Sequence, residues 1–366
     1  MFLSPELPKP MNMLTTCRTA LLGLALIGQL ACGPLTLRAG AEETDGYRPP
    51  SYKPAREFMP ADEARAHRYN GTVAIWFTSH YQVDSRDWDN IQEFKGPFHP
   101  RLGYYKSDDP AVLRQQLRWL RRAGIDAIVY DVFSTGKWKL TDLPRDKTLQ
   151  LLVKELSHQE QESRTLRLII WLEKYLSNPT AEEYRYALAY VRQHLAGRDF
   201  YYRYHGAPLI VAYRNGPSNV VGDDFRQIER ENKFFAIHRI RPYASADWSY
   251  IQQYPQPFNY QWMPVSPGID PALENAYIAK YVSHQTPAPL RFAPRDEKFF
   301  QTQLLRARQE GPEIIFVSGW NDWQYGCQIE PAKEYGFRYV DMAARFLGRE
   351  AETAPYRQEK KKGKAP

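Results

Sequence analysis

Short runs of apolar, mostly β-branched residues alternate along the chain with longer stretches in which apolar side chains recur every three or four positions. A continuous apolar run is typical of a strand buried on both faces, and the longer spacing is typical of a helix that covers it. Such alternation predicts a parallel sheet with helices packed on its faces. Strand patterns occur at 73–77, 125–132, 166–173, 208–213, 234–237, 260–265 and 314–317.

The first predicted helix shows both of its ends in the sequence. An Asp-Asp-Pro sequence at 108–110 supplies an N-cap carboxylate and a proline for the first turn. Leu113, Leu117 and Leu120 then form one apolar face, and Gly124 follows as the residue that ends the helix. The same pattern predicts further helices at 145–158, 181–195, 223–232, 271–283 and 297–310.

These alternating units predict a single-domain (β/α)8 TIM-type barrel over residues 67–348. The segment is close to the length of about 250 residues that is typical of this fold, and one further strand is needed to complete eight. A doubly wound open sheet is the alternative. That fold usually carries a glycine-rich turn of the G-x-G-x-x-G type after its first strand, and no such turn follows 73–77.

Residues 1–41 have the features of a secretory signal peptide. Two basic residues precede the apolar run 20–33, and Ala-Gly-Ala at 39–41 provides a small-x-small cleavage pattern. The run is shorter than the ~20 residues that span a membrane, so no stable membrane span is expected. Cys32 allows lipoprotein anchoring as an alternative, but Gln29 stands where an aliphatic residue is usual. We therefore expect a secreted or periplasmic protein.

Charge and polarity separate two further segments from the barrel. Residues 42–66 are rich in proline and polar side chains and read as an extended lead-in. Residues 349–366 are lysine-rich and read as a basic disordered tail. Most of the formal net charge of +7 lies in the leader and this tail, so the barrel is nearly neutral. A nucleic-acid partner is therefore not expected, and the oligomeric state is left open.

Cysteine usage and the spacing of possible ligands argue against a metal or another cofactor. Cys327 is the only cysteine after the leader, which excludes an internal disulfide in the mature chain. The sequence contains no H-E-x-x-H motif and no acidic calcium-binding loop. We therefore predict a site made of side chains alone.

The predicted strands end in polar and aromatic residues, at the end of a barrel where active sites are built. Acids follow two apolar runs, at Asp131 and Glu173, and the segment after the last strand adds Asp322 and Tyr325. We take these four as candidate catalytic residues, although Asp131 and Glu173 could each instead be a structural acid paired with an arginine. His99 could likewise fix its loop to the barrel. The candidate carbohydrate-binding residues are Trp76, His99, Tyr104, Tyr105, Tyr213, His238, Trp320, Asn321, Trp323, Gln328 and Glu330.

Four segments resemble glycoside hydrolase family 99, the endo-α-mannosidase and endomannanase family. Residues 98–110 resemble its H-P-x-L-G-Y-Y-S-S-D-D-P segment, and 168–175 resemble a strand ending in E-x-Y. Residues 263–268 match an S-P-G turn, and 314–331 are similar to the signature N-E-W-x-E-G-T-Q-I-E-P. The resemblance runs in order over 73–336, which is nearly the whole predicted barrel.

The resemblance implies a reaction that uses two carboxylates of the signature. The first would deprotonate the sugar 2-hydroxyl to give a 1,2-anhydro intermediate, and the second would protonate the leaving oxygen. In this chain Asp322 stands at the first position and Tyr325 at the second. A tyrosine, with a reference pKa of about 10, is a poor proton donor near neutral pH unless its surroundings lower that value.

Three hypotheses follow from these two substitutions. In the first, the protein is a glycoside hydrolase acting on a glycan or polysaccharide, such as an α-mannoside. Asp322 would then serve as base or nucleophile, assisted by Glu173, Asp131 or Tyr325. In the second, it is a carbohydrate-binding barrel that kept the cleft and lost the general acid. In the third, the barrel acts on a different bond in a polysaccharide.

Overall fold

The structure, a computed structural model, is described here for the part of the chain that carries the predicted sheet. All described residues belong to the unit 49–366, which separates from residues 1–48. The predicted signal peptide and lead-in, most of the tail and the predicted helix 271–283 lie outside this part. The described residues are 68–81, 88, 97–134, 139–159, 162, 164–174, 180–212, 223–238, 262–270, 295–323 and 326–349.

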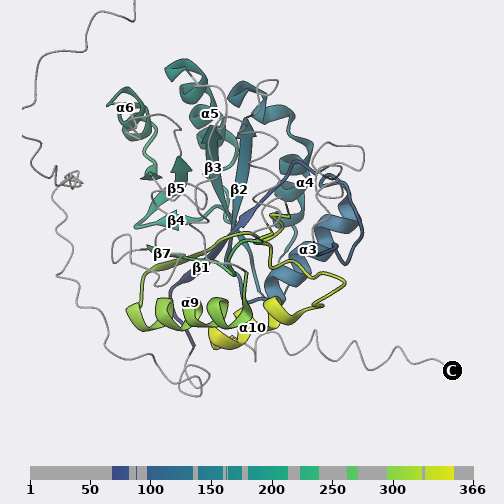
Figure 1. The fold of residues 1–366 in the computed structure, drawn as a ribbon. Coiled ribbons are helices and arrows are strands. Elements are labelled where there is room, and N and C mark those ends of the chain that lie inside the picture. Colours follow the sequence, from purple (N-terminus) through teal and green to yellow (C-terminus); the bar gives the residue numbers. More distant parts are fainter. Residues whose placement is uncertain are drawn as a thin grey trace, which may run out of the picture. The chain divides into compact units, whose positions relative to one another are not determined.

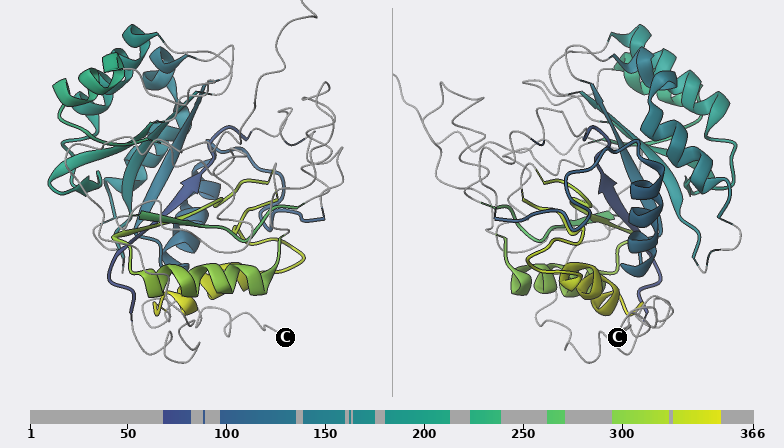
Figure 2. Two further views of the ribbon diagram at one scale, coloured as in Figure 1. Left: turned by 60° about the vertical axis from the view of Figure 1, so that its left-hand side comes forward. Right: turned by 90° about the vertical axis from the view of Figure 1, so that its right-hand side faces the viewer.

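Seven parallel strands form one curled sheet in the order β6-β5-β3-β2-β1-β8-β7 (Figures 1 and 2). Each lies on one of the seven apolar runs, so the predicted strands are confirmed. The short strand β4 (Arg203–Tyr204) pairs antiparallel with β5. The parallel strands are β1 (Thr72–Phe77), β2 (Ala127–Ser134), β3 (Arg167–Lys174), β5 (Ala207–Ala212), β6 (Phe235–His238), β7 (Trp262–Val265) and β8 (Ile314–Val317).

Within the described residues the sheet runs from β6 to β7 without these two strands pairing. The mixed α/β architecture and the curl agree with the predicted fold class, but the described strands do not close a complete barrel. A parallel sheet joined through helices excludes an all-β or all-α fold, as the alternating pattern predicted.

The sheet is buried on both faces, which explains why its strands read as continuous apolar runs. Along β1, Val73, Ile75 and Phe77 belong to the core between sheet and helices, whereas Ala74 and Trp76 belong to a second core on the inner face of the curl. This second core is made of strand residues and two tyrosines beside β4. Its buried members are Ala74, Trp76, Ala127, Val129, Ile169, Trp171, Tyr202, Tyr204, Leu209, Val211, Ile237, Trp262, Ile314 and Phe316.

Helix α3 begins at the cap predicted from Asp-Asp-Pro at 108–110. Asp109 accepts a hydrogen bond of 2.7 Å from the Ala111 N–H, and Asp146, Thr180 and Asp296 cap later helices in the same way. The described helices are α3 (Pro110–Arg122), the 3-10 helix η1 (Leu140–Arg145), α4 (Lys147–Leu156), α5 (Ala181–His194), α6 (Asp223–Glu231), α9 (Glu297–Glu310) and α10 (Arg338–Phe346). None of them is long and apolar enough to cross a membrane.

Two of these helices were not predicted. The 3-10 helix η1 lies just before the helix predicted at 145–158, which the structure has as α4, and it contains Pro144. Helix α10 buries Tyr339, Val340, Ala343 and Phe346, among others, on one face. That three-to-four spacing is present in the sequence and could have identified α10.

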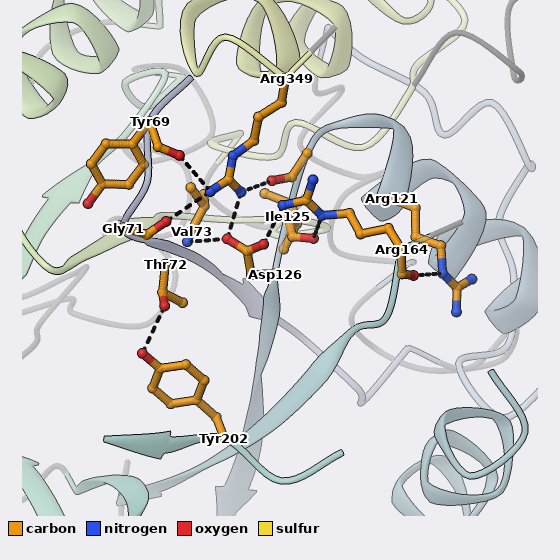
Figure 3. A network of polar contacts seen from close by, with 11 residues as sticks. Tyr69, Gly71, Thr72, Val73, Arg121, Ile125, Asp126, Arg164, Tyr202 and Arg349 are labelled. Carbon is orange, nitrogen blue, oxygen red and sulfur yellow. Dashed lines mark hydrogen bonds and ion pairs between the residues drawn. The ribbon is translucent and has the colours of Figure 1, made fainter. Parts of the chain in front are cut away.

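A network of arginines and one aspartate joins the N-terminal ends of β1 and β2 to the last described residue, Arg349 (Figure 3). Arg349 donates to the carbonyls of Tyr69 at 3.1 Å and Gly71 at 2.8 Å, and to the carboxylate of Asp126 at 2.6 Å. Asp126 also pairs with Arg164 and accepts from the backbone N–H of β1. Arg349 was placed at the start of the basic tail, but it is buried and belongs to the folded unit.

Candidate active site

The segment after β8, Ser318–Pro331, is called the site loop here; its residues 324 and 325 lie outside the described part. It continues the β1–β8 pairing, because the Trp320 N–H donates to the Trp76 carbonyl at 2.7 Å. It then turns back on itself, since the Glu330 N–H donates to the Trp320 carbonyl at 2.7 Å. Gly319 makes this return possible: its φ is +83°, and a Cβ there would lie 2.7 Å from the Cys327 carbonyl oxygen.

Asp322 lies on this loop at the C-terminal end of the sheet, and 5% of its surface is exposed. The Cys327 thiol lies 3.5 Å from Asp322 Oδ2 and donates to it. Burial, and next the nearby Asp322 carboxylate, raise the pKa of the Cys327 thiol well above its usual value. The thiol therefore stays protonated and able to donate to the carboxylate.

Asn321 ties the site loop to the residues that follow β1. Its Oδ1 accepts from the Thr78 N–H and its Nδ2 donates to the Thr78 carbonyl, both at 2.8 Å. The same Nδ2 also donates to the Tyr105 hydroxyl at 3.3 Å. The side-chain amide thus bonds the backbone of Thr78 as a paired strand would, and it joins two segments far apart in the sequence. All of its described bonds go to protein groups.

Glu330 lies beneath the site loop and is completely buried. Its Oε2 accepts from the Tyr105 hydroxyl and from the Trp323 indole N–H, both at 2.8 Å, and its Oε1 accepts from the Gln116 amide of α3 at 3.1 Å. Burial raises the pKa of Glu330 to about 7, and the three hydrogen bonds oppose that rise. We predicted that Glu330 binds substrate, but here its contacts are internal.

The aromatic residues of the site mostly pack against one another. Trp323 donates its backbone N–H to the Tyr81 hydroxyl at 3.2 Å, and Tyr81 stacks on Trp88 with ring centroids 4.3 Å apart. The Trp88 indole donates to the Tyr105 carbonyl at 2.7 Å. Trp320, Trp323 and Tyr105 are all buried. Sequence reasoning did not include Tyr81, Trp88 or Gln116 among the site residues, because their partners lie in distant segments.

Asp131 lies on the inner face of the sheet, near the C-terminal end of β2. It continues the alternation of Ala127 and Val129 on that face, is buried, and stands opposite Trp171 in register. Trp76 packs its ring 5.2 Å from that of Trp171. Strand β1 separates β2 from β8, so Asp131 and Asp322 come from strands on either side of β1.

Other predicted residues lie at the edge of this arrangement or outside the described part. His99 is exposed, and its backbone N–H and ring bond Glu334 at 2.8 and 2.6 Å. Its contacts match the alternative of fixing a loop. Tyr104 is half-buried beside Trp88. Gln328 is fully buried. Tyr213 and Tyr325 lie outside the described residues, as do the side chains of Glu173 and His238 at the ends of β3 and β6.

Taken together, the described site presents the buried carboxylates of Asp131 and Asp322 at the ends of the two strands that flank β1, an aromatic surround and a loop held by the buried Glu330. Carboxylates in such positions can accept a proton or attack an electrophilic carbon. Among the described residues, no group of three or more His, Cys, Asp or Glu side chains is arranged to hold a metal ion.

No protein-family model matches the chain. Two curated relatives, the glycoprotein endo-alpha-1,2-mannosidase-like proteins of mouse and human, are each 22% identical over 278 residues. The alignment covers 64% of this chain and 58% and 57% of the relatives, so the chain spans less than two thirds of their length.

Solved structures share the fold. The GH99 endo-alpha-mannosidase of Bacteroides thetaiotaomicron, bound to bis-tris-propane, matches with a TM-score of 0.50 and 15% identity, over 78% of this chain and 99% of that one. A glycoside hydrolase-like protein matches with a TM-score of 0.50 and 11% identity, over 82% and 97%. The sequence similarity to the two relatives and the fold shared with the solved structures therefore confirm the predicted resemblance to glycoside hydrolase family 99.

Proposed function

We propose that the protein is a glycoside hydrolase that cleaves a glycan or polysaccharide, and that Asp322 is its base or nucleophile. The observation that carries this proposal is the buried Asp322 carboxylate at the C-terminal end of β8, held by a protonated thiol at 3.5 Å. It occupies the position of the first carboxylate in the family 99 signature. The names of the relatives and of the structural neighbour make α-mannosides the first substrates to test.

Hydrolysis also needs a group that protonates the leaving oxygen. Asp131 is the described candidate, because it is a buried carboxylate on the inner face of the sheet, one strand beyond β1. Glu173, at the end of β3, and Tyr325 remain further candidates from the sequence.

Replacing the carboxylate of Asp322 should remove most of the activity. We expect Asp322→Asn to lower kcat/KM for a cleaved glycan by about 10²–10⁴-fold, because a positioned acid–base group contributes that much. The measurement is product release from α-mannans and bacterial exopolysaccharides. Asp131→Asn should lower kcat/KM as well if Asp131 is the acid.

Asp199→Asn is a matched control, since Asp199 is exposed and lies between α5 and β4, away from the site. It should leave kcat/KM unchanged. Turnover by Asp322→Asn at the wild-type rate would rule out the assignment of Asp322.

A carbohydrate-binding protein without catalysis is the second candidate. The observation that favours it is Tyr325 at the place of the second signature carboxylate. Saturable binding on a glycan array without any product from the wild-type chain would support this candidate, whereas multiple turnovers of any glycan would exclude it.

Two further parts of the proposal come from the sequence. The first is a complete (β/α)8 barrel, of which the described residues supply seven parallel strands. The second is export through the signal peptide 1–41. Fractionation of cells that express the full chain, compared with a chain that begins at residue 42, tests export directly.

A further inference from the structure

The two residues that flank Asp322 are both held by one pair of buried side chains. Asn321 donates to the Tyr105 hydroxyl at 3.3 Å, and Trp323 donates its indole N–H to Glu330 at 2.8 Å. Tyr105 itself donates to the same oxygen of Glu330 at 2.8 Å. The bonds on either side of Asp322 therefore converge on the carboxylate of Glu330. The five residues Tyr105, Gln116, Asn321, Trp323 and Glu330 are called the Glu330 network.

The described groups that bond the Glu330 carboxylate are all neutral: a phenol, an indole and an amide. A buried carboxylate without an opposite charge is held in place by its hydrogen bonds, and each bond to an ionised acceptor is stronger than one to a neutral acceptor. Gln116 lies on α3, so the carboxylate also connects the site loop to a helix that packs on the sheet. Burying a carboxyl group here costs more free energy than burying an apolar side chain of the same size.

We propose that Glu330 is a positioning residue that fixes Asp322 at the end of β8 by holding Trp323 and, through Tyr105, Asn321. The proposal rests on the hydrolase function proposed above, because it assigns how the Asp322 carboxylate is kept in its reactive place. Glu330 is completely buried, and it would act on Asp322 through Trp323 and Tyr105.

The position of Glu330 gives the network a dependence on pH. Burial raises its pKa to about 7, so it changes charge near neutral pH. Above pH 7 the ionised carboxylate accepts all three bonds. Below pH 7 one oxygen carries a proton and the charge assistance is lost, so the bonds to Trp323 and Tyr105 weaken.

The other titratable groups around the carboxylate keep their charge state over this range. Burial, and next Glu330 itself, raise the pKa of Tyr105 well above its usual value. Tyr335 donates to the Glu330 backbone carbonyl at 2.6 Å, and burial raises its pKa as well. The Arg295 guanidinium lies over the ring of Tyr335, 5.1 Å from its centroid. Cys327 donates to Asp322 and stays protonated.

The variant Glu330→Gln keeps the size of the side chain and removes its charge, so it tests the two contributions separately. A glutamine keeps one oxygen for the Trp323 and Tyr105 donors, and its amide nitrogen can donate to Gln116 once the Gln116 amide has turned over. It cannot ionise near neutral pH. Glu330→Ala removes all three acceptors and serves as the stronger disruption, while Glu155→Gln makes the same chemical change on α4, where Glu155 pairs with Arg114.

The first measurement follows the indole N–H of Trp323 by 15N-edited NMR of the full chain between about pH 5.5 and 8.5, with Trp323→Phe to identify the signal. We expect its shift to titrate with a midpoint of about 7 in the wild type and in Glu155→Gln, and to stay constant in Glu330→Gln. A signal that titrates in Glu330→Gln with the same midpoint, or that does not move in the wild type, overturns the proposal.

The second measurement is the pH profile of kcat and KM on a cleaved glycan. We expect the wild type to lose kcat below a midpoint of about 7, and Glu330→Gln to lose that limb of the profile. Glu330→Ala should lower kcat by on the order of 10²-fold with a smaller change in KM, because a carboxylate displaced by about 1 Å loses that much rate.

An unchanged kcat in a folded Glu330→Ala protein overturns the positioning role. If the Trp323 signal behaves as expected while the wild type cleaves no glycan, the attachment of the loop by Glu330 stands and the hydrolase function fails.

Discussion

At each end of the sheet an acidic side chain joins segments far apart in the sequence, but it does so in opposite ways. At the N-terminal ends of β1 and β2, Asp126 pairs with two cations, Arg349 and Arg164 (Figure 3). At the C-terminal ends, Glu330 is fully buried and accepts from neutral donors. A paired carboxylate keeps its charge at low free-energy cost, whereas an uncompensated one is costly when ionised.

This difference matches what each end has to do. The N-terminal end joins the first strand to the end of the described chain, and its bonds to backbone carbonyls stabilise the fold. The C-terminal end carries Asp322, and its carboxylate network orients a loop at the expense of stability. Costly, precisely bonded groups of this kind are expected where a protein holds functional side chains. The following three predictions test the comparison, from the largest expected effect to the smallest.

Removing Arg349 should produce the largest loss of stability. Arg349→Ala deletes a buried guanidinium that bonds the carbonyls of Tyr69, Gly71 and Gly124, and it leaves these groups without that donor. We expect the free energy of unfolding to fall by about 3–5 kcal/mol, the range for breaking a buried pair. Urea unfolding followed by tryptophan fluorescence measures it.

Arg349→Lys keeps the charge but cannot bridge all of these acceptors, so it should lose less than the alanine variant. A loss below about 1 kcal/mol in Arg349→Ala, the level of an exposed ion pair, would show that the network at this end is not important for stability.

Ionisation of Glu330 should lower the free energy of unfolding as the pH rises. Its pKa is raised from 4.5 to about 7 in the folded chain, so between these values the folded protein holds the proton more tightly than the unfolded one. The resulting stabilisation is fully present below about pH 4.5 and is lost as the pH passes 7. At 1.36 kcal/mol for each tenfold change in the proton equilibrium, the contribution is on the order of 3 kcal/mol.

Glu330→Gln should remove this part of the pH dependence, and urea unfolding at about pH 5 and 8 measures it. The difference in unfolding free energy between wild type and variant should change by that amount between the two pH values. A constant difference would mean that Glu330 ionises alike in folded and unfolded chains.

A methyl group at Gly124 should have the smallest of the three effects. Gly124 has a φ of +77°, and a Cβ there would lie 3.0 Å from two carbon atoms of Arg349. We expect Gly124→Ala to cost about 1–2 kcal/mol for the left-handed backbone alone, and more because of the contact. Thermal unfolding of single and double variants measures both parts.

Gly311→Ala is the matched control, since Gly311 has a φ of +65° and no atom within 4 Å of the added Cβ. Combining Gly124→Ala with Arg349→Ala removes the contact with the Arg349 Cδ but keeps the one with its Cβ, so the extra cost at position 124 should shrink without vanishing. An equal loss in Gly124→Ala and Gly311→Ala would show that Arg349 can move aside freely.

The sequence predicted where several site residues lie along the chain, but it did not predict their contacts. Asp131 and Asp322 were predicted at strand ends, and the structure places both there, buried and on either side of β1. The period-2 alternation that puts Asp131 on the inner face is local information. The partner of Asp322, by contrast, is Cys327, which reaches it only because the loop folds back at Gly319.

The sequence by itself determined the strands, most helices, the cap of the first one and the family resemblance, because these depend on patterns within some twenty neighbouring residues. The tertiary structure decided which polar residues bond to one another across the fold. Glu330 meets Gln116 across 214 positions, and Asn321 meets Thr78 across 243. Bonds over such separations exist only after the sheet has curled, and they turned a predicted sugar-binding carboxylate into an internal one.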